Sequence, residues 1–379
     1  MKITDVKTYI VPEHVSSDDW CRGKAWLLIK VETDTGIEGW GEAYVANDRE
    51  HVMAQMVQEL ARYLDGMDPM RIKYFKTMAT ENFAGNLCGV DLYSAVTGIE
   101  IALWDIVGKT LGTPVHNLLG GPCRNRIEVY ANCWSTSPRT PDELANYAAG
   151  QVALGFKAVK IYPFLYSTKL EQGIERLNAV RETLGPDINI KVDAWRVAES
   201  GSLTKIADAL RACDVEWFED PISPDTVDVM ADIRRITQLP IVTGETFCTK
   251  QEFRVLLENH AADIMNPDIT CCGILEINEI AAMAQTYKKR VTIHNYNTMA
   301  IGLSASLQVA AVIPNFTCVE YFQRFDAPTK LFAKHNFKVE DDGCIALSNE
   351  PGLGVSIDET ALANFDYKQA PIRQWPDSV

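Results

Sequence analysis

Three apolar runs in the middle of the chain decide its fold: INIKVDA (188–194), VEWFEDP (215–221) and IVTGETF (241–247). Each run carries a carboxylate near its end, and Asp193, Glu219 and Glu245 follow one another at intervals of 26 residues. A strand, a turn, a helix and a return loop fill an interval of this length, so the runs indicate successive βα units of a parallel sheet. Parallel strands are buried on both faces and therefore read as continuous apolar runs.

The three carboxylates are expected at the carboxyl ends of their strands, where α/β enzymes hold their reactive groups. Like charges a few ångströms apart raise one another's pKa, so three converging carboxylates stay ionised only beside a cation. A set of oxygen ligands suits a hard ion, and magnesium is the first expectation. A single acid of this kind more often caps a helix or pairs with a surface Lys. Three acids at one interval favour a metal site.

A similar interval separates further strand-end residues along the chain. Asp268 in ADIMNPD, His294 in VTIHN and Glu320 in TCVEYF follow at intervals of 23, 26 and 26 residues. Upstream, the run AVKIYPF places Lys160 and Tyr162 on a strand, and the run IEVYANC precedes it. Eight strand-like runs with helical stretches between them predict a β/α barrel.

Length, charge and cysteine usage narrow the class of protein. The 379 residues suffice for a barrel of about 200 to 250 residues and a smaller second domain. A net charge of −15 argues against nucleic acid and anionic membranes as partners. The ten cysteines form no CxxC pair and are expected to be reduced thiols. The N-terminus has no apolar signal region and no run approaches 18 apolar residues, so we expect a cytoplasmic protein without a membrane span.

The flanks of the barrel are predicted to form a second domain. Strands are expected at residues 2–12 and 24–33, joined by a polar loop, and helical periodicity covers residues 48–80. A long helix is expected to end at Gly112, which is a plausible C-cap. After Glu320 the sequence returns to strand and turn material. We therefore expect three parts: an α+β domain at residues 1–125, a barrel at 126–329, and a segment at 330–379 that completes the first domain.

Several motifs together resemble the enolase superfamily and, within it, the mandelate racemase subgroup. In chain order they read ALWDIVGKTLGTPVHNLLGG, KVDAW, WFEDP, VTGET, NPD, IHN, VEYF and PGLGVSID. The resemblance covers nearly the whole chain, and the order and spacing of the motifs are its specific feature. It implies an α/β fold in which an α+β capping domain covers a modified TIM barrel, (β/α)7β. It also implies Mg2+ held by Asp193, Glu219 and Glu245.

The reaction that this family shares is removal of the proton α to a carboxylate, which gives an enediolate. The negative charge that develops must face fixed positive charge in a dry site. The resemblance implies that Lys160 and His294 flank the substrate from opposite sides. Asp268 would accept a hydrogen bond from the far imidazole nitrogen and fix its tautomer. Glu320 would have to be protonated to donate to the substrate carboxylate.

A strand-end Lys or His is, on its own, more often a surface or core residue. The Asp one βα unit before His294 favours the catalytic interpretation here.

The chain departs from the family pattern at two positions. On the second barrel strand the subgroup often has Lys-x-Lys, but this chain has Lys160-Ile161-Tyr162. A second Lys would lower the pKa of the first by repulsion, whereas Tyr162 can donate a hydrogen bond or act as a weak acid. Two residues beyond Asp193, relatives carry Asn or His, and this chain has Trp195. Trp195 is equally expected to wall the pocket or to pack against the next loop.

Substrate choice in the family depends on two capping loops. In the first loop, at residues 13–23, the candidates for substrate binding are His14, Trp20 and Arg22. In the second loop, at residues 81–89, the candidate is Asn82. Exposed loop residues face solvent more often than they contact a ligand.

The leading functional prediction is dehydration of a sugar acid or related 2,3-dihydroxy acid to a 2-keto-3-deoxy acid. A racemase or epimerase that uses Lys160 and His294 on opposite faces is the alternative. Cycloisomerases and dipeptide epimerases usually place a Lys on the sixth strand, and NPDIT has none. A non-catalytic metal-binding scaffold would usually have lost one of these groups. The expected partners are a small-molecule carboxylate and further copies of the chain, as a homo-oligomer.

Overall fold

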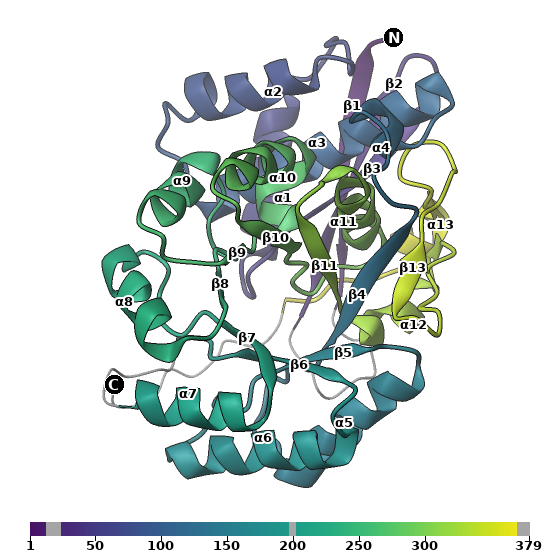
Figure 1. Cartoon of the computed structure of the whole chain (residues 1–379). Coiled ribbons are helices and arrows are strands. Elements are labelled where there is room, and N and C mark those ends of the chain that lie inside the picture. Colours follow the sequence, from purple (N-terminus) through teal and green to yellow (C-terminus); the bar gives the residue numbers. More distant parts are fainter. Residues whose placement is uncertain (13–23, 197–201, 370–379) are drawn as a thin grey trace.

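The computed structural model describes residues 1–12, 24–196 and 202–369. Its centre is a barrel of eight parallel strands, and β11 pairs with β4 to close it (Figure 1). The strands are β4 (Arg126–Asn132), β5 (Ala158–Ile161), β6 (Asn189–Asp193), β7 (Val215–Glu219), β8 (Ile241–Thr243), β9 (Ile264–Met265), β10 (Arg290–Ile293) and β11 (Phe316–Tyr321). The barrel predicted from the interval of about 26 residues is confirmed.

One helix follows each of the first seven barrel strands and packs on the outside of the barrel (Figure 1). The helices are α5 (Pro141–Ala153), α6 (Leu170–Leu184), α7 (Leu203–Ala212), α8 (Val227–Thr237), α9 (Lys250–Glu258), α10 (Ile269–Thr286) and α11 (Ala300–Val312). Helices α7, α8 and α9 turn their apolar residues inward, whereas α11 is buried along its whole length. This order of elements is the (β/α)7β barrel that the sequence predicts.

The amino-terminal part forms an antiparallel sheet of three strands that packs on long helix α3 (Val90–Leu111). The strands are β1 (Ile3–Val11), β2 (Trp26–Thr33) and β3 (Glu38–Ala43). A Cβ added at Gly41 would lie 1.8 Å from the carbonyl oxygen of Gly98, so only glycine permits this approach of β3 to α3. Gly112 has φ of +64° and ends α3, which confirms the predicted cap.

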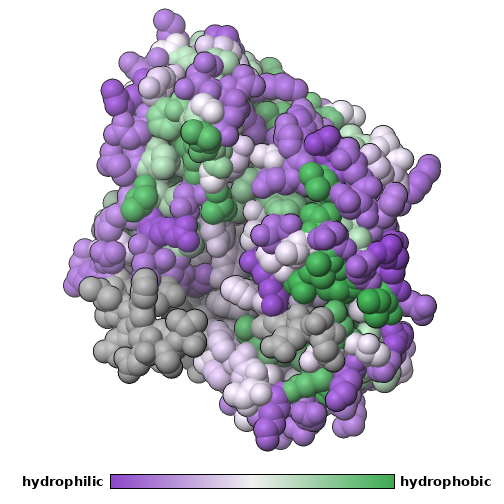
Figure 2. Space-filling view, turned by 90° about the vertical axis from the view of Figure 1, so that its left-hand side faces the viewer, coloured by the Kyte–Doolittle hydropathy of each residue, from purple (hydrophilic) through white to green (hydrophobic). Residues whose placement is uncertain are grey.

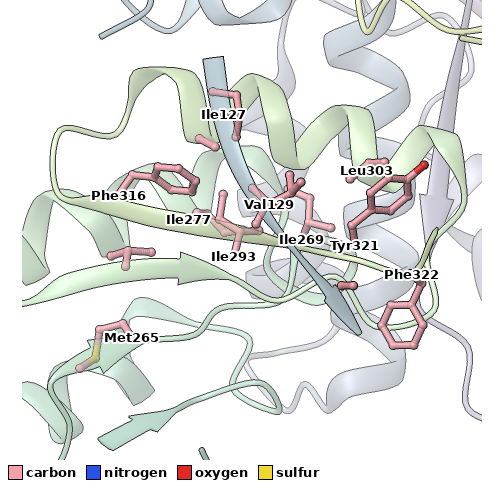
Figure 3. Packing of buried hydrophobic residues seen from close by; sticks show 14 of the residues in the cluster. Ile127, Val129, Met265, Ile269, Ile277, Ile293, Leu303, Phe316, Tyr321 and Phe322 are labelled. Carbon is pink, nitrogen blue, oxygen red and sulfur yellow. The ribbon is translucent and has the colours of Figure 1, made fainter. Parts of the chain in front are cut away.

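Shorter helices complete the cap beside this sheet: α1 (Glu50–Ala61), α2 (Ile72–Met78), a π-helical turn η3 (Ala79–Phe83) and α4 (Val115–Leu118). The chain has two main apolar clusters: one lies within the cap, and the other fills the barrel and includes the cap residues Trp26, Trp40 and Ile101. Figure 3 shows part of the barrel core, where residues from β4, β10, β11 and α10 lie together. The part of the chain described by the structure contains no helix long and apolar enough to cross a membrane.

The carboxyl-terminal segment contacts both the barrel and the cap. It contains η4 (Gln323–Phe325), α12 (Asp326–Thr329), β12 (Ala333–Lys334), β13 (Cys344–Ala346), β14 (Ser356–Ile357) and α13 (Glu359–Ala363). Strand β13 pairs antiparallel with β4, whereas Glu359 forms an ion pair of 2.6 Å with Lys30 in β2. The division of the chain at residues 125 and 329 stays a prediction.

The outer surface is mainly polar. Figure 2 shows one face, which is largely hydrophilic with separate small hydrophobic groups. Some apolar side chains of the outer helices remain exposed, including Val229 and Ile236 on α8. Isolated exposures of this kind are normal for a globular protein.

Candidate active site

Three of the predicted carboxylates lie at the carboxyl ends of adjacent strands. Asp193 ends β6 and Glu219 ends β7, and the two are directly paired in the sheet. Glu245 lies two residues after β8. Parallel pairing brings these strand ends to one edge, because every strand of the barrel runs in the same direction. The three carboxylates therefore lie at the edge of the barrel where the sequence predicts them.

Lys160 lies among these carboxylates and is fully buried. Its Nζ is 2.7 Å from Oε1 of Glu219, 2.9 Å from Oε1 of Glu320 and 3.5 Å from Oδ2 of Asp193. Burial lowers the pKa of Lys160, but Glu219 and Glu320 outweigh it, and the pKa lies well above 10.5. In this arrangement the three carboxylates favour the charged form of Lys160.

His294 is held between carboxylates at both ring nitrogens. Nδ1 lies 2.7 Å from Oδ2 of Asp268, which is the predicted His–Asp pair. Nε2 lies 3.0 Å from Oε2 of Glu245 and 3.4 Å from Oε2 of Glu320. Burial lowers the pKa of His294, yet the surrounding carboxylates raise it well above 6.5. The imidazolium form is thus strongly stabilised here.

Asp268 is itself fixed by the start of α10. Its Oδ1 accepts hydrogen bonds from the backbone N–H groups of Thr270 and Cys271. Its Oδ2 accepts one from the backbone N–H of Tyr296, and the Tyr296 ring stacks parallel to the imidazole at 6.2 Å between centroids. The carboxylate that orients His294 therefore has a single position.

Glu320 differs from its predicted state. We expected a protonated Glu320, but its pKa is lowered: burial raises it, and the charges of Lys160 and His294 outweigh burial. The expectation is wrong because it considered the neighbouring carboxylates and not the two cations that barrel closure brings to Glu320. In this arrangement Glu320 is an acceptor.

The carboxylates fit a metal ion in their chemistry. Atoms of Glu219, Glu245 and His294 lie within 4.8 Å of one another, a set that includes two of the three predicted ligands. The third, Asp193, has a buried Oδ2 without a hydrogen-bond partner among the described residues. Burial raises the pKa of Asp193 to about 7 and that of Glu219 to about 8. Buried carboxylates that resist ionisation need added positive charge, which a divalent cation supplies.

Two asparagines complete the site, and the sequence analysis missed both. Asn266 Nδ2 donates to Oε1 of Glu219 at 2.9 Å, and Asn132 Nδ2 donates to Oε1 of Glu320 at 2.6 Å. The signal was present, because Asn132 ends β4 and Asn266 follows β9. An uncharged amide at a strand end is a weaker signal of a functional site than an acid is.

A second missed group lies beside Glu245. Arg196 lies 3.4 Å from Glu245 and 3.3 Å from Asp220, a buried acid that also accepts from Thr243 at 2.6 Å. Trp195 and Arg196 have φ of +46° and +66°, the left-handed region that such side chains seldom adopt. The turn after Asp193 is held in this conformation and directs the Arg196 side chain toward the carboxylates.

A cavity of about 190 Å3 opens over His294. It is lined by Tyr44, Arg49, Val90, Trp134, Tyr162, Trp195, Glu245, Thr246, Asp268, Cys271, His294 and Tyr296. Trp195 therefore walls the pocket, the first of its two expected positions. Tyr162 also lines it, immediately after β5, whereas Lys160 does not reach the lining. Among the lining residues that the sequence analysis missed, Tyr44 and Arg49 come from the cap.

Four residues of the two capping loops were predicted to bind the substrate. His14, Trp20 and Arg22 lie outside the described residues. Asn82 lines a different cavity within the cap, with Leu60 and Phe75 among its neighbours, and contacts the sulfur of Met78. A role for these four residues in substrate binding stays a prediction.

Comparisons with known proteins agree with this architecture. The family model described as "Mandelate racemase / muconate lactonizing enzyme, N-terminal domain" matches residues 1–120. The model "Enolase C-terminal domain-like" matches residues 143–361.

Similar proteins cover almost the whole chain. The D-xylonate dehydratase of Haloferax volcanii is 31% identical over 95% of this chain and 88% of the relative. The D-galactonate dehydratase of Ralstonia pickettii is 32% identical over 100% of this chain and 97% of the relative. A crystal structure of an enolase from Sargasso Sea environmental sequencing superposes with a TM-score of 0.91 at 30% identity and covers 97% of both chains.

Proposed function

This chain belongs to the mandelate racemase subgroup of the enolase superfamily, and from that premise we propose that it is a metal-dependent sugar acid dehydratase. The reaction removes water from a 2,3-dihydroxy acid and yields a 2-keto-3-deoxy acid. The names of the two dehydratases that it resembles over almost its whole length support this reaction class.

One observation of the site carries the proposal: His294, a group with acid–base capacity, lines the pocket, whereas Lys160 is fully buried and does not line it. A racemase of this kind needs one base on each face of the substrate. Lys160 is fully buried and does not line the pocket, which disfavours the two-base alternative.

The imidazole of His294 carries the proton in the proposed dehydration. In its neutral form, the imidazole takes the α proton at Nε2. The imidazolium that results, which Asp268 and Glu320 stabilise, then gives this proton to the departing β-hydroxyl, so that one water molecule is lost and the enol product becomes the keto acid. Asp268 keeps the second nitrogen oriented and stabilises the imidazolium between the two transfers. General acid–base catalysis of this kind accounts for roughly 10²- to 10⁴-fold in rate.

Asp193, Glu219 and Glu245 are proposed to hold the metal, and Mg2+ is proposed because oxygen ligands suit a hard ion. When bound, the metal supplies positive charge opposite the substrate carboxylate and makes the α proton more acidic. The fixed charge of Lys160 acts in the same direction. Glu320 accepts hydrogen bonds, and Tyr162 and Trp195 form part of the pocket wall.

We also propose a cytoplasmic homo-oligomer. The nine cysteines in the described part of the chain are free, which supports a reducing compartment. Tyr63, Tyr74 and Phe83 line one cavity of the cap and are 68%, 46% and 37% exposed, which supports a covered face in an assembly. Light scattering of the purified protein measures the oligomeric state directly.

A screen of an acid-sugar library with Mg2+ tests the function. D-galactonate and D-xylonate are the first members, and formation of 2-keto-3-deoxy acid is the measured product. If deuterium from the solvent enters a substrate but no keto acid forms, the result would favour an epimerase over a dehydratase. The absence of both across the library would leave a non-catalytic metal-binding protein.

A further inference from the structure

The side-chain amide of Asn132 has one orientation. Asn132 is the last residue of β4 and only 1% exposed. The backbone N–H of Trp134 donates to its Oδ1 at 2.6 Å. Because a backbone N–H can only donate, the oxygen of the amide must face Trp134, and the NH2 group must face the opposite side.

The two protons of this NH2 group have two acceptors. One goes to Oε1 of Glu320 at 2.6 Å and the other to the phenolic oxygen of Tyr162 at 3.0 Å. The Tyr162 oxygen is thus an acceptor toward Asn132, and its own proton must point elsewhere. Among the residues that the structure describes, no acceptor for that proton is recorded, and Tyr162 lines the cavity over His294.

We infer that Asn132 is a positioning residue that turns the Tyr162 hydroxyl into a hydrogen-bond donor to an oxygen of the substrate. This inference rests on the proposed function and names a specificity contact within it. Burial holds the pKa of Tyr162 well above 10, so the phenol keeps its proton in the site. Tyr162, oriented by the Asn132 amide, therefore replaces the second Lys of the usual pattern with a neutral, directed donor.

The test is a double-mutant cycle of Asn132→Asp and Tyr162→Phe. The Asp side chain keeps an acceptor for the Trp134 N–H, but presents an oxygen to Tyr162, whose proton then turns inward. Each single variant is expected to raise KM about tenfold, the effect of one lost hydrogen bond. The double variant is expected to raise KM no further, because the same contact is already lost. The Asp side chain introduced at position 132 also repels Glu320. This repulsion is present both in Asn132→Asp and in the double variant, and we expect it to lower mainly kcat.

A matched control separates positioning from general destabilisation. Asn315 donates from Nδ2 to the carbonyl oxygens of Ala281 and Lys289, at the start of β11 and away from the pocket. Asn315→Asp is expected to lower the Tm and to leave KM unchanged. KM effects of Asn132→Asp and Tyr162→Phe that multiply to about a hundredfold in the double variant would overturn the inference.

A failure of the proposed function can be distinguished from a failure of the inference about Asn132. If the parent protein forms no keto acid, the proposed function is wrong. The double-mutant cycle is then carried out on binding instead of on KM. Calorimetry measures the Kd of each variant for the library acid that binds the Mg2+-loaded parent most tightly. A non-additive Kd cycle keeps Asn132 as the residue that positions Tyr162. An additive cycle rejects it.

Discussion

Nζ of Lys160 lies 2.7 Å from Oε1 of Glu219, so a carboxylate proposed to hold the metal also neutralises a fully buried ammonium. The same ammonium contacts Glu320 at 2.9 Å. Lys160 thus joins the proposed metal ligands to the far side of the barrel, where β11 closes on β4. Its role follows from this position and differs from that of the pocket-lining His294.

Lys160→Met is expected to retain more activity than His294→Asn. The first change removes a fixed charge that the metal partly replaces, whereas the second removes the group that carries the proton. We expect His294→Asn to lose roughly 10²- to 10⁴-fold in kcat. Steady-state kinetics of both variants on the substrate found in the screen provide the comparison. Equal inactivity, together with loss of a neutral-range titration in Lys160→Met, would favour the racemase instead.

Removal of the metal is expected to abolish keto acid formation. After treatment with a chelator, Mg2+ should restore activity better than Zn2+, because the three proposed ligands Asp193, Glu219 and Glu245 are hard oxygen donors. Activity is measured during titration of each metal into the treated protein. Full turnover in excess chelator would contradict metal dependence.

Glu219→Gln is expected to weaken Mg2+ binding strongly while the fold persists. The amide cannot supply the negative charge, and it leaves Lys160 with one carboxylate fewer. Calorimetry measures the Kd for Mg2+, and circular dichroism checks the fold. The control is Glu258→Gln, an exposed acid paired with Arg254 on α9, which should bind Mg2+ like the parent. Unchanged affinity in Glu219→Gln would exclude Glu219 as a ligand.

Lys76→Met is expected to destabilise the contact between cap and barrel. Lys76 Nζ lies 3.0 Å from Glu100 and 2.7 Å from the carbonyl oxygen of Cys272. Without the ammonium, fully buried Glu100 loses its ion-pair partner and keeps the hydrogen bond from the backbone N–H of Leu275. We expect a loss of roughly 3–5 kcal/mol in the free energy of unfolding. The control Lys73→Met breaks an exposed pair with Glu279 and should lose at most about 1 kcal/mol.

The pH dependence of this contact follows from the pKa of Lys76. Burial lowers that pKa, but the charges of Glu100 and Glu276 raise it by more than burial lowers it. The pKa of Lys76 therefore lies above 10.5. Since the folded pKa exceeds the unfolded one, the stabilisation is complete below about pH 10 and is lost as the pH rises through the folded value. Urea unfolding at pH 7 should therefore separate parent from Lys76→Met, and the difference should shrink at pH above the folded pKa. Equal stability of the two at pH 7 would refute the contribution.

The sequence alone determined the barrel and the positions of its charged strand ends. Strand identity depends on local apolar runs, and the interval of about 26 residues depends on the length of a βα unit. Both are properties of contiguous sequence. The spacing of Asp193, Glu219 and the pair of Asp268 and His294 is therefore enough to place them at one edge of the barrel. Gly112 as the end of α3 is a local feature of the same kind.

Only the tertiary structure decided which groups meet and in which charge state. Closure of the barrel brings Asn132 of β4 to Glu320 of β11, across 188 residues of sequence, and no local pattern encodes that contact. The charges of Lys160 and His294 then outweigh burial and lower the pKa of Glu320, opposite to expectation. Electrostatic energy depends on distance and solvent exclusion, which exist only once the strands have assembled.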